Sequence, residues 1–161
     1  MSKIRRYYEP NAVYNITCNA YARRPIFKGK KAADCLLSTL GYYRYILRFS
    51  LYCYCIMPEH LHVIIQPHLK KYNISQIMKH IKGSFARTHN NLTYKSGPIW
   101  QNRFYDTILR DEQALMTRIN YILQNPIRAN IIREAEDYPY SSAKVYLKDE
   151  EDHITDKYIA K

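Results

Sequence analysis

Two kinds of apolar spacing follow each other along this chain, and their order constrains the fold more than any other feature. Four segments are typical of strands, because apolar residues alternate with polar ones or form short apolar runs. Three segments carry apolar residues at helical spacing. The expected strands cover residues 14–20, 49–57, 61–65 and 104–109, and the expected helices cover residues 30–41, 74–87 and 111–125. The order β-α-β-β-α-β-α predicts a ferredoxin-like α+β sandwich with an antiparallel sheet and one added C-terminal helix.

The length and composition favour one globular domain. The 161 residues contain no internal repeat or linker, so we expect a domain at residues 1–142 and a charged, peripheral C-terminal segment at residues 143–161. No apolar run approaches the roughly 18 residues of a membrane helix, and no signal-peptide core follows the N-terminus. The four cysteines form no CxxC pair, which predicts buried, reduced thiols. Together these features predict a cytoplasmic, nucleoid-associated protein.

Basic residues are concentrated in the first two thirds of the chain. The 25 Lys and Arg against 14 Asp and Glu give a net charge of +11, and residues 1–110 hold 18 basic and 4 acidic residues. This excess favours a polyanionic partner. Each candidate DNA contact given below can equally well be a basic side chain exposed to solvent or, for an aromatic residue, a side chain of the core. The candidates for phosphate pairing or base stacking are Arg5, Arg6, Arg23, Arg24, Lys79, Lys82, Arg87, Trp100, Arg103 and Arg110.

His60 and His62 lie two residues apart in an expected strand. Their side chains therefore project from one face, while Leu61 and Val63 point to the other. With Cα atoms about 7 Å apart, the two imidazoles can converge on one metal ion. An HxH pattern alone is a weak signal, and it suits several divalent ions. Glu59 is expected on the face opposite His60, so no general base is assigned.

The apolar stripe of the last helix does not include Tyr121. At about 100° per residue, Tyr121 lies about 140° from the centre of that stripe, which predicts that its ring faces away from the core. Asn125 follows four residues later and about 40° around the helix, so the two side chains can reach the same small volume. Gln124 is the weaker candidate. Because Asn125 precedes Pro126, its backbone direction is not fixed by helical spacing.

Five sequence blocks, in this order, resemble the REP-associated tyrosine transposases, a branch of the HUH single-tyrosine transposases. They are MPEHLHVIIQP, IKGSFARTHN, GPIWQNRFYDTILRDEQAL, RINYILQNPIRANII and DYPYSS, spanning roughly residues 57–142, and the N-terminal strand and the RRPIF segment fit as well. The chain departs from the family in having RAN where RAG is common and YPYSS where YPWSS is common. Neither departure touches the expected chemistry, but both lie in a part that shapes hairpin preference.

The resemblance implies a role for each residue of the candidate site. His60 and His62 correspond to metal ligands, Asn125 to the third ligand and Tyr121 to the nucleophile. The implied protein is a DNA transposase or endonuclease that cleaves and rejoins single-stranded DNA near hairpins through a 5′-phosphotyrosine intermediate, with Mg²⁺ or Mn²⁺. Its expected partner is DNA with a hairpin, from REP-like repeats or element ends. The protein is expected to be a monomer or a homodimer, and Tyr121 serves its own site or a partner's.

Two other functions stay open from the residues alone. The ferredoxin-like layout is shared with RNA-recognition domains, which predicts a non-catalytic module for single-stranded nucleic acid. That alternative lacks an RNP-like G-F-x-F run and does not explain an outward Tyr121. The second alternative is a metal-dependent hydrolase that activates water, and it would not need Tyr121. Substitution of Tyr121 by Phe therefore separates the three functions.

Overall fold

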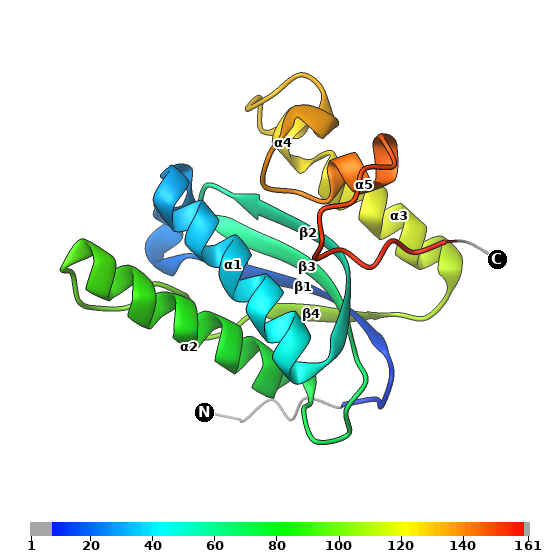
Figure 1. The fold of residues 1–161 in the computed structure, drawn as a ribbon, viewed down its shortest axis with the longest axis horizontal. Helices are drawn as coiled ribbons and strands as arrows, with labels where there is room; N and C mark the ends of the chain where they lie inside the picture. Colours follow the sequence, from blue (N-terminus) through cyan, green and yellow to red (C-terminus); the bar gives the residue numbers. More distant parts are fainter. Residues whose placement is uncertain (1–7, 160–161) are drawn as a thin grey trace.

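A four-stranded antiparallel sheet forms the centre of the protein (Figure 1). The computed structural model describes residues 8–159, so Arg5 and Arg6 lie outside the described residues. Neighbouring strands follow the order β2-β3-β1-β4. This is the α+β arrangement that the sequence predicts. The strands are β1 (Val13–Asn19), β2 (Phe49–Met57), β3 (His60–Pro67) and β4 (Tyr105–Leu109).

The predicted helices are present, and the first is longer than its apolar spacing indicates. It continues past Gly41 to Leu47, whose side chain is buried, and it ends where Arg48 takes a left-handed conformation with φ 48°. None of the helices within residues 8–159 is long and apolar enough to cross a membrane. The α-helices are α1 (Lys30–Leu47), α2 (Ile74–Thr93), α3 (Glu112–Leu123), α4 (Asn125–Arg128) and α5 (Ala143–Leu147), and short 3₁₀ turns occupy Tyr21–Arg23, Ile26–Lys28 and Ala135–Asp137.

Helices α1 and α2 lie side by side across one face of the sheet (Figure 1). The strand residues that point toward them include Ile16, Leu61 and Val63, which are fully buried. Leu36 of α1 and Ile77 of α2 complete the same apolar cluster. Since every second residue of β1 and β3 enters this cluster, the alternation in the sequence places the intervening residues on the opposite face.

Helix α3 packs on the opposite face, mainly against β2. Its stripe residues, including Ile119 and Ile122, form a second apolar cluster with Cys55, Met57 and Ile64. The register of the strands shows that these sheet residues share a face with the two histidines, because His60 lies opposite Met57 and His62 lies opposite Cys55. The second face is therefore apolar beneath α3 and polar beside it.

The two ends of α3 differ in how well they follow the prediction. Asp111 caps the first turn as predicted, because its Oδ1 accepts a hydrogen bond of 2.7 Å from the backbone N–H of Ala114. The helix ends at Leu123, and Pro126 does not simply stop it. Pro126 instead lies in the first turn of α4, where a missing backbone N–H has no intrahelical partner to lose.

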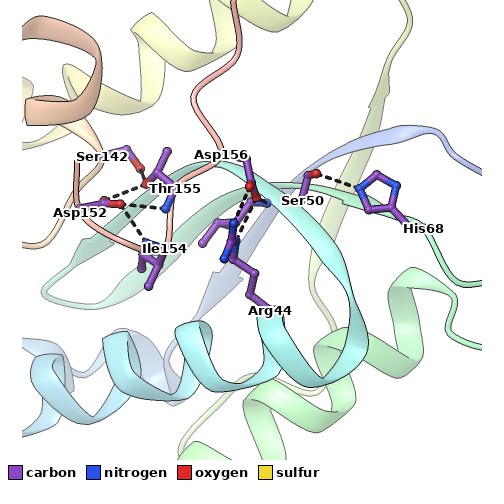
Figure 2. A network of polar contacts seen from close by, with 9 residues as sticks. Arg44, Ser50, His68, Ser142, Asp152, Ile154, Thr155 and Asp156 are labelled. Atoms are coloured by element: carbon purple, nitrogen blue, oxygen red, sulfur yellow. Dashed lines mark hydrogen bonds and ion pairs between the residues drawn. The ribbon is translucent and has the colours of Figure 1, made fainter. Parts of the chain in front are cut away.

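The charged C-terminal segment is packed on the sheet edge, which differs from the peripheral position that we predicted (Figure 2). Backbone bonds join Asp156 and Leu51 of β2, and the Asp156 carboxylate also accepts bonds from the Leu51 N–H and from Arg44 of α1. Ile154 packs so closely on α1 that a Cβ at Gly41 would lie 3.0 Å from its Cγ2. The high charge of the segment does not reveal these contacts, because the Asp156 carboxylate accepts hydrogen bonds from the protein and not only from solvent.

All four cysteines are free thiols. Cys18, Cys53 and Cys55 are buried, as predicted, whereas Cys35 is only half-buried on α1. Burial raises the pKa of the Cys55 thiol far above its ordinary value, so this side chain behaves as an apolar core residue beneath α3.

Candidate active site

His60 and His62 converge at the start of β3. Their side chains lie on one face of the sheet, and their Nε2 atoms approach to 3.0 Å, with the two rings nearly perpendicular at 88°. Both residues are half-buried beside α3. The strand alternation thus brings together the two imidazoles as the sequence predicts, with the same ring nitrogen of each facing the other.

The other nitrogen of each imidazole has a fixed partner. Nδ1 of His60 lies 2.9 Å from Oε1 of Glu59, and Nδ1 of His62 lies 2.9 Å from Oγ1 of Thr17. Thr17 is the residue directly opposite His62 on β1. These contacts favour a tautomer with the proton on Nδ1, which leaves the lone pair on Nε2.

The position of Glu59 differs from the prediction. Regular alternation would place its side chain opposite His60, but Glu59 belongs to the turn between β2 and β3 and not to the strand. The turn lets its carboxylate reach the His60 ring. Glu59 therefore orients His60. The contact between Thr17 and His62 could not be predicted from the sequence, because it depends on which strands are neighbours in the sheet.

Both imidazoles are neutral near pH 7. Burial lowers the pKa of His60, although the adjacent Glu59 carboxylate opposes this effect. Burial also lowers the pKa of His62, to about 3, and the adjacent His60 and the positive charges of Arg118 and Arg128 act in the same direction. The neutral form is the one that binds a metal ion through a nitrogen lone pair.

The histidine pair fits two adjacent positions around a divalent ion. Ligands at about 2.1 Å and at right angles are about 3.0 Å apart, which matches the Nε2 separation. Asn19 lies opposite His60 on β1, and its buried Oδ1 has no hydrogen-bond partner within the described structure. No set of three His, Cys, Asp or Glu side chains gathers at one point in residues 8–159. A third protein ligand would therefore have to be an amide or another oxygen.

Tyr121 points away from the apolar stripe of α3, as predicted, and is 48% exposed. Two guanidinium groups flank its ring. The Cζ atom of Arg118 lies 5.2 Å from the ring centroid and that of Arg128 lies 4.0 Å from it. The charges of the same two arginines also lower the pKa of His62.

Sequence reasoning missed Arg118 and Arg128 as site residues. The signal was nevertheless available, because Arg118 precedes Tyr121 by three residues and therefore shares its helix face. Arg128 lies seven residues after Tyr121, but α3 ends between them, so helical spacing alone would not have placed it. Its Nη2 donates a 2.5 Å hydrogen bond to the backbone oxygen of Tyr121.

Asn125 lies at the junction of α3 and α4. Its Nδ2 donates to the backbone oxygens of Tyr121 and Ile122, at 3.4 and 3.2 Å, so the amide group closes the last turn of α3. These bonds use the nitrogen, which leaves Oδ1 as the atom for a metal ion. Gln124 is the exposed C-cap of α3. The ligand role of Asn125 stays a prediction.

The residues predicted to contact DNA lie on several elements, and some of them already have partners within the protein. Arg23 and Arg24 lie exposed in the turn after β1, although Arg24 donates a 2.5 Å bond to the oxygen of Pro98. Lys82 of α2 donates to the oxygen of Gln101. Arg110 forms an ion pair of 2.8 Å with Glu9. The remaining candidates, exposed on α2 and before β4, are Lys79, Arg87 and Arg103.

Trp100 does not match its predicted role. The side chain is only 6% exposed and packs against Phe27 and Phe85, with ring centroids 5.0 and 5.6 Å away. Its Nε1 donates a 3.1 Å bond to the oxygen of Lys82. Burial makes this ring part of the core, which argues against the prediction that it stacks on an unpaired base.

Comparisons with known proteins show the family and the fold of this chain. The family model described as "Transposase IS200 like" matches residues 9–125. "Putative REP-associated tyrosine transposase" of Haemophilus influenzae is 28% identical over 116 residues, which cover 63% of this chain and 66% of that protein. The REP-associated tyrosine transposase of Escherichia coli is 24% identical over 151 residues, covering 88% of this chain and 82% of that protein.

The fold also matches a solved structure of a REP-associated tyrosine transposase bound to a REP hairpin. The TM-score is 0.78 at 20% sequence identity, and the match covers 100% of this chain and 94% of the other. The resemblance noted in the sequence blocks is thus confirmed by the family model, the relatives and the fold together. The chain belongs to the IS200-like transposase family, and its similar relatives are REP-associated tyrosine transposases.

Proposed function

We propose that this protein cleaves and rejoins single-stranded DNA beside a hairpin through a covalent tyrosine intermediate. The observation that carries the proposal is the convergence of His60 and His62, whose Nε2 atoms are 3.0 Å apart on the sheet face that α3 covers. The outward ring of Tyr121 on α3 is exposed to substrate. A pair of metal ligands and a phenol that substrate can reach are the two parts that nucleophilic phosphoryl transfer requires.

In the proposed reaction, the Oη atom of Tyr121 attacks the scissile phosphorus. A bond forms between Oη and phosphorus as the bond from phosphorus to the 3′ oxygen breaks. The phenol loses its proton, and the departing oxygen takes up a proton to become a 3′-OH. The protein then holds the 5′ phosphate as a phosphotyrosine. Attack by another 3′-OH reverses these bonds and rejoins DNA, so neither ATP nor water is consumed.

His60, His62 and Asn125 would hold the divalent ion, Mg²⁺ or Mn²⁺. When bound, such an ion polarises the scissile phosphate and stabilises the charge on its oxygens. Glu59 and Thr17 keep the Nε2 lone pairs directed at the ion site by holding the two Nδ1 atoms. The orphaned Oδ1 of Asn19 offers a further oxygen beside His60. This mixture of nitrogen and amide oxygen suits a hard divalent cation.

The proposed partner is a DNA hairpin with single-stranded flanks. The support is the similarity to relatives named REP-associated tyrosine transposases and to a structure solved with a REP hairpin. The exposed cations Lys79, Arg87 and Arg103 provide phosphate contacts away from the histidines. Such contacts predict an affinity that falls with increasing salt.

The test uses hairpin-forming oligonucleotides drawn from the DNA on either side of the gene, labelled at the 3′ end because the 3′ fragment carries the 5′ phosphate. With Mg²⁺ or Mn²⁺, we expect a labelled protein band on a denaturing gel and no band in EDTA. Tyr121→Phe should abolish this band while the affinity for the hairpin is retained. Tyr105→Phe is the matched control, since Tyr105 is also exposed and lies on the same sheet face.

Each alternative function predicts a different result. A non-catalytic binding module gives retention of the hairpin with neither cleavage nor adduct in any metal ion. A hydrolase gives cleaved DNA without attached protein, and its rate does not change in the Tyr121→Phe variant. Either result contradicts the proposed strand transfer.

A further inference from the structure

Tyr121 is contacted by two arginines that come from different helices. Arg118 belongs to α3 and Arg128 to α4, and their guanidinium carbons lie 5.2 and 4.0 Å from the ring centroid. Arg128 is also bound to the backbone oxygen of Tyr121 at 2.5 Å. The junction between the two helices thus brings two positive charges close to one exposed phenol.

The charge of this pair is available to a ligand. Within residues 8–159, neither Arg118 nor Arg128 forms an ion pair with a carboxylate, whereas Arg110 is neutralised by both oxygens of Glu9. A guanidinium that stacks on an aromatic ring uses its flat face, so N–H groups at its edge can still donate hydrogen bonds to an oxyanion. An arginine pair without a carboxylate therefore indicates an anion site.

A groove along α3 reaches Arg118 and Tyr121. It has a volume of about 640 Å³, and its lining also includes Leu109, Thr117 and Asp111, whose carboxylate caps α3. Pockets for small ligands occupy roughly 300–1,000 Å³, so a nucleotide fits this space. Arg118 and Tyr121 thus belong both to the groove and to the cluster of two guanidinium groups around the ring.

We propose that Arg118 and Arg128 form a clamp that binds the non-bridging oxygens of the scissile phosphodiester and holds the Tyr121 phenol against its phosphorus. This clamp rests on the proposed function of Tyr121. Guanidinium groups bind phosphate oxygens with paired, charge-assisted hydrogen bonds. Their fixed positive charge stabilises the additional charge that these oxygens gain as Oη attacks. Both arginines are then catalytic residues that contact the substrate.

The first measurement is the rate of adduct formation at saturating DNA and metal ion. We expect Arg118→Gln and Arg128→Gln each to lower this rate about 100-fold, the scale for loss of one preorganised donor. Hairpin affinity should change by less than about 10-fold, because other basic residues supply most phosphate contacts. Arg133→Gln, which removes an exposed arginine of the loop after α4, is the control and should match the wild type.

The second measurement distinguishes substrate contact from a structural role. A methylphosphonate at the scissile position replaces one charged oxygen by a neutral methyl group. If the clamp holds that oxygen, wild type and Arg118→Gln should react with this substrate at rates within about 3-fold of each other. An equal 100-fold loss on both substrates would overturn the clamp, and so would an unchanged rate of both arginine variants on ordinary DNA.

The clamp and the proposed function fail in distinguishable ways. If the wild type forms no adduct, strand transfer by Tyr121 is contradicted, and the clamp is then tested by binding alone. A methylphosphonate is placed at each position of the single-stranded flank in turn, and binding is measured for the Tyr121→Phe protein and for the double variant Tyr121→Phe, Arg118→Gln. The substitution should weaken binding to the Tyr121→Phe protein at one position. At that position it should have no effect on binding to the double variant. If both proteins respond alike at every position, the clamp is excluded. Thermal unfolding of each variant checks that the fold is retained.

Discussion

The two faces of the sheet differ, although they are made by the same strands. The face toward α1 and α2 is closed, with Ile16, Leu61 and Val63 fully buried. The other face is covered in part by α3 (Figure 1), where it is apolar, and it also presents the two histidines and Thr17. A single strand, β3, thus contributes alternate residues to a core and to a site.

Because alternate residues of β3 point to opposite faces of the sheet, those on one face contribute to stability and the histidines on the other contribute to the candidate site. Residues on the face toward α1 and α2 lose contacts in a packed core when they are truncated, which lowers the free energy of unfolding. On the other face, Ile64 packs beneath α3, whereas His60 and His62 contact each other and their polar partners. Substitutions on the two faces should therefore affect different measurements, even for residues that are neighbours in sequence.

The largest expected effect is that of His62→Ala on strand cleavage. If the proposed function holds, loss of one of two imidazole ligands removes the divalent ion, and adduct formation should fall by at least about 1,000-fold. Most of the salt-sensitive DNA affinity should remain, since the basic surface supplies it. The measurement compares single-turnover adduct formation with hairpin binding at several salt concentrations.

His68→Ala is the matched control for this substitution. His68 follows β3 and contacts Ser50, as Figure 2 shows, and its removal should leave cleavage unchanged. Loss of folding in His62→Ala would contradict a purely chemical role for this face, because the histidine would then be holding the sheet together.

On the closed face, Ile65→Ala should act on stability. Ile65 is fully buried and lies opposite Tyr14 and Leu51 in the sheet. Truncation of a buried isoleucine costs about 2–5 kcal/mol of unfolding free energy. Urea unfolding should show this loss, while the rate of adduct formation per folded molecule stays within about 3-fold of wild type. A large loss of rate without loss of stability would break the distinction between the faces.

Most of the fold could be predicted from apolar spacing. The alternation of Tyr14, Ile16 and Cys18 and the stripe of α3 are direct consequences of burial on one side. The end of α1 and the packing of the C-terminal segment could not be predicted in this way. They depend on tertiary partners, such as the Leu51 backbone that Asp156 binds, which lie far away in sequence.

The candidate site could be predicted only where local geometry determines it. The shared face of His60 and His62 and the outward direction of Tyr121 follow from strand and helix periods. The contact between Glu59 and His60 depends on turn geometry, and the position of Arg128 depends on the break between α3 and α4. The burial of Trp100 could not be predicted in this way, because the basic residues around it in the sequence do not indicate which side chains cover its ring in the fold.

The smallest expected effect distinguishes orientation from ligation on the open face. Thr17→Val keeps the size and the β-branched shape of the side chain but removes the hydroxyl that lies 2.9 Å from Nδ1 of His62. The fold should be unaffected, because valine suits a strand. Without this partner, His62 loses the contact that fixes its ring and its tautomer, and such losses lower metal affinity or activity about 10–100-fold. Titration of Mn²⁺ against adduct formation should therefore show a higher half-saturating concentration with a similar maximum. Thr107→Val, a threonine on the same face of β4 whose hydroxyl accepts a bond from Asn15, should leave this concentration unchanged. If both substitutions shift it equally, the hydroxyls act through the general polarity of this face and Thr17 does not orient His62.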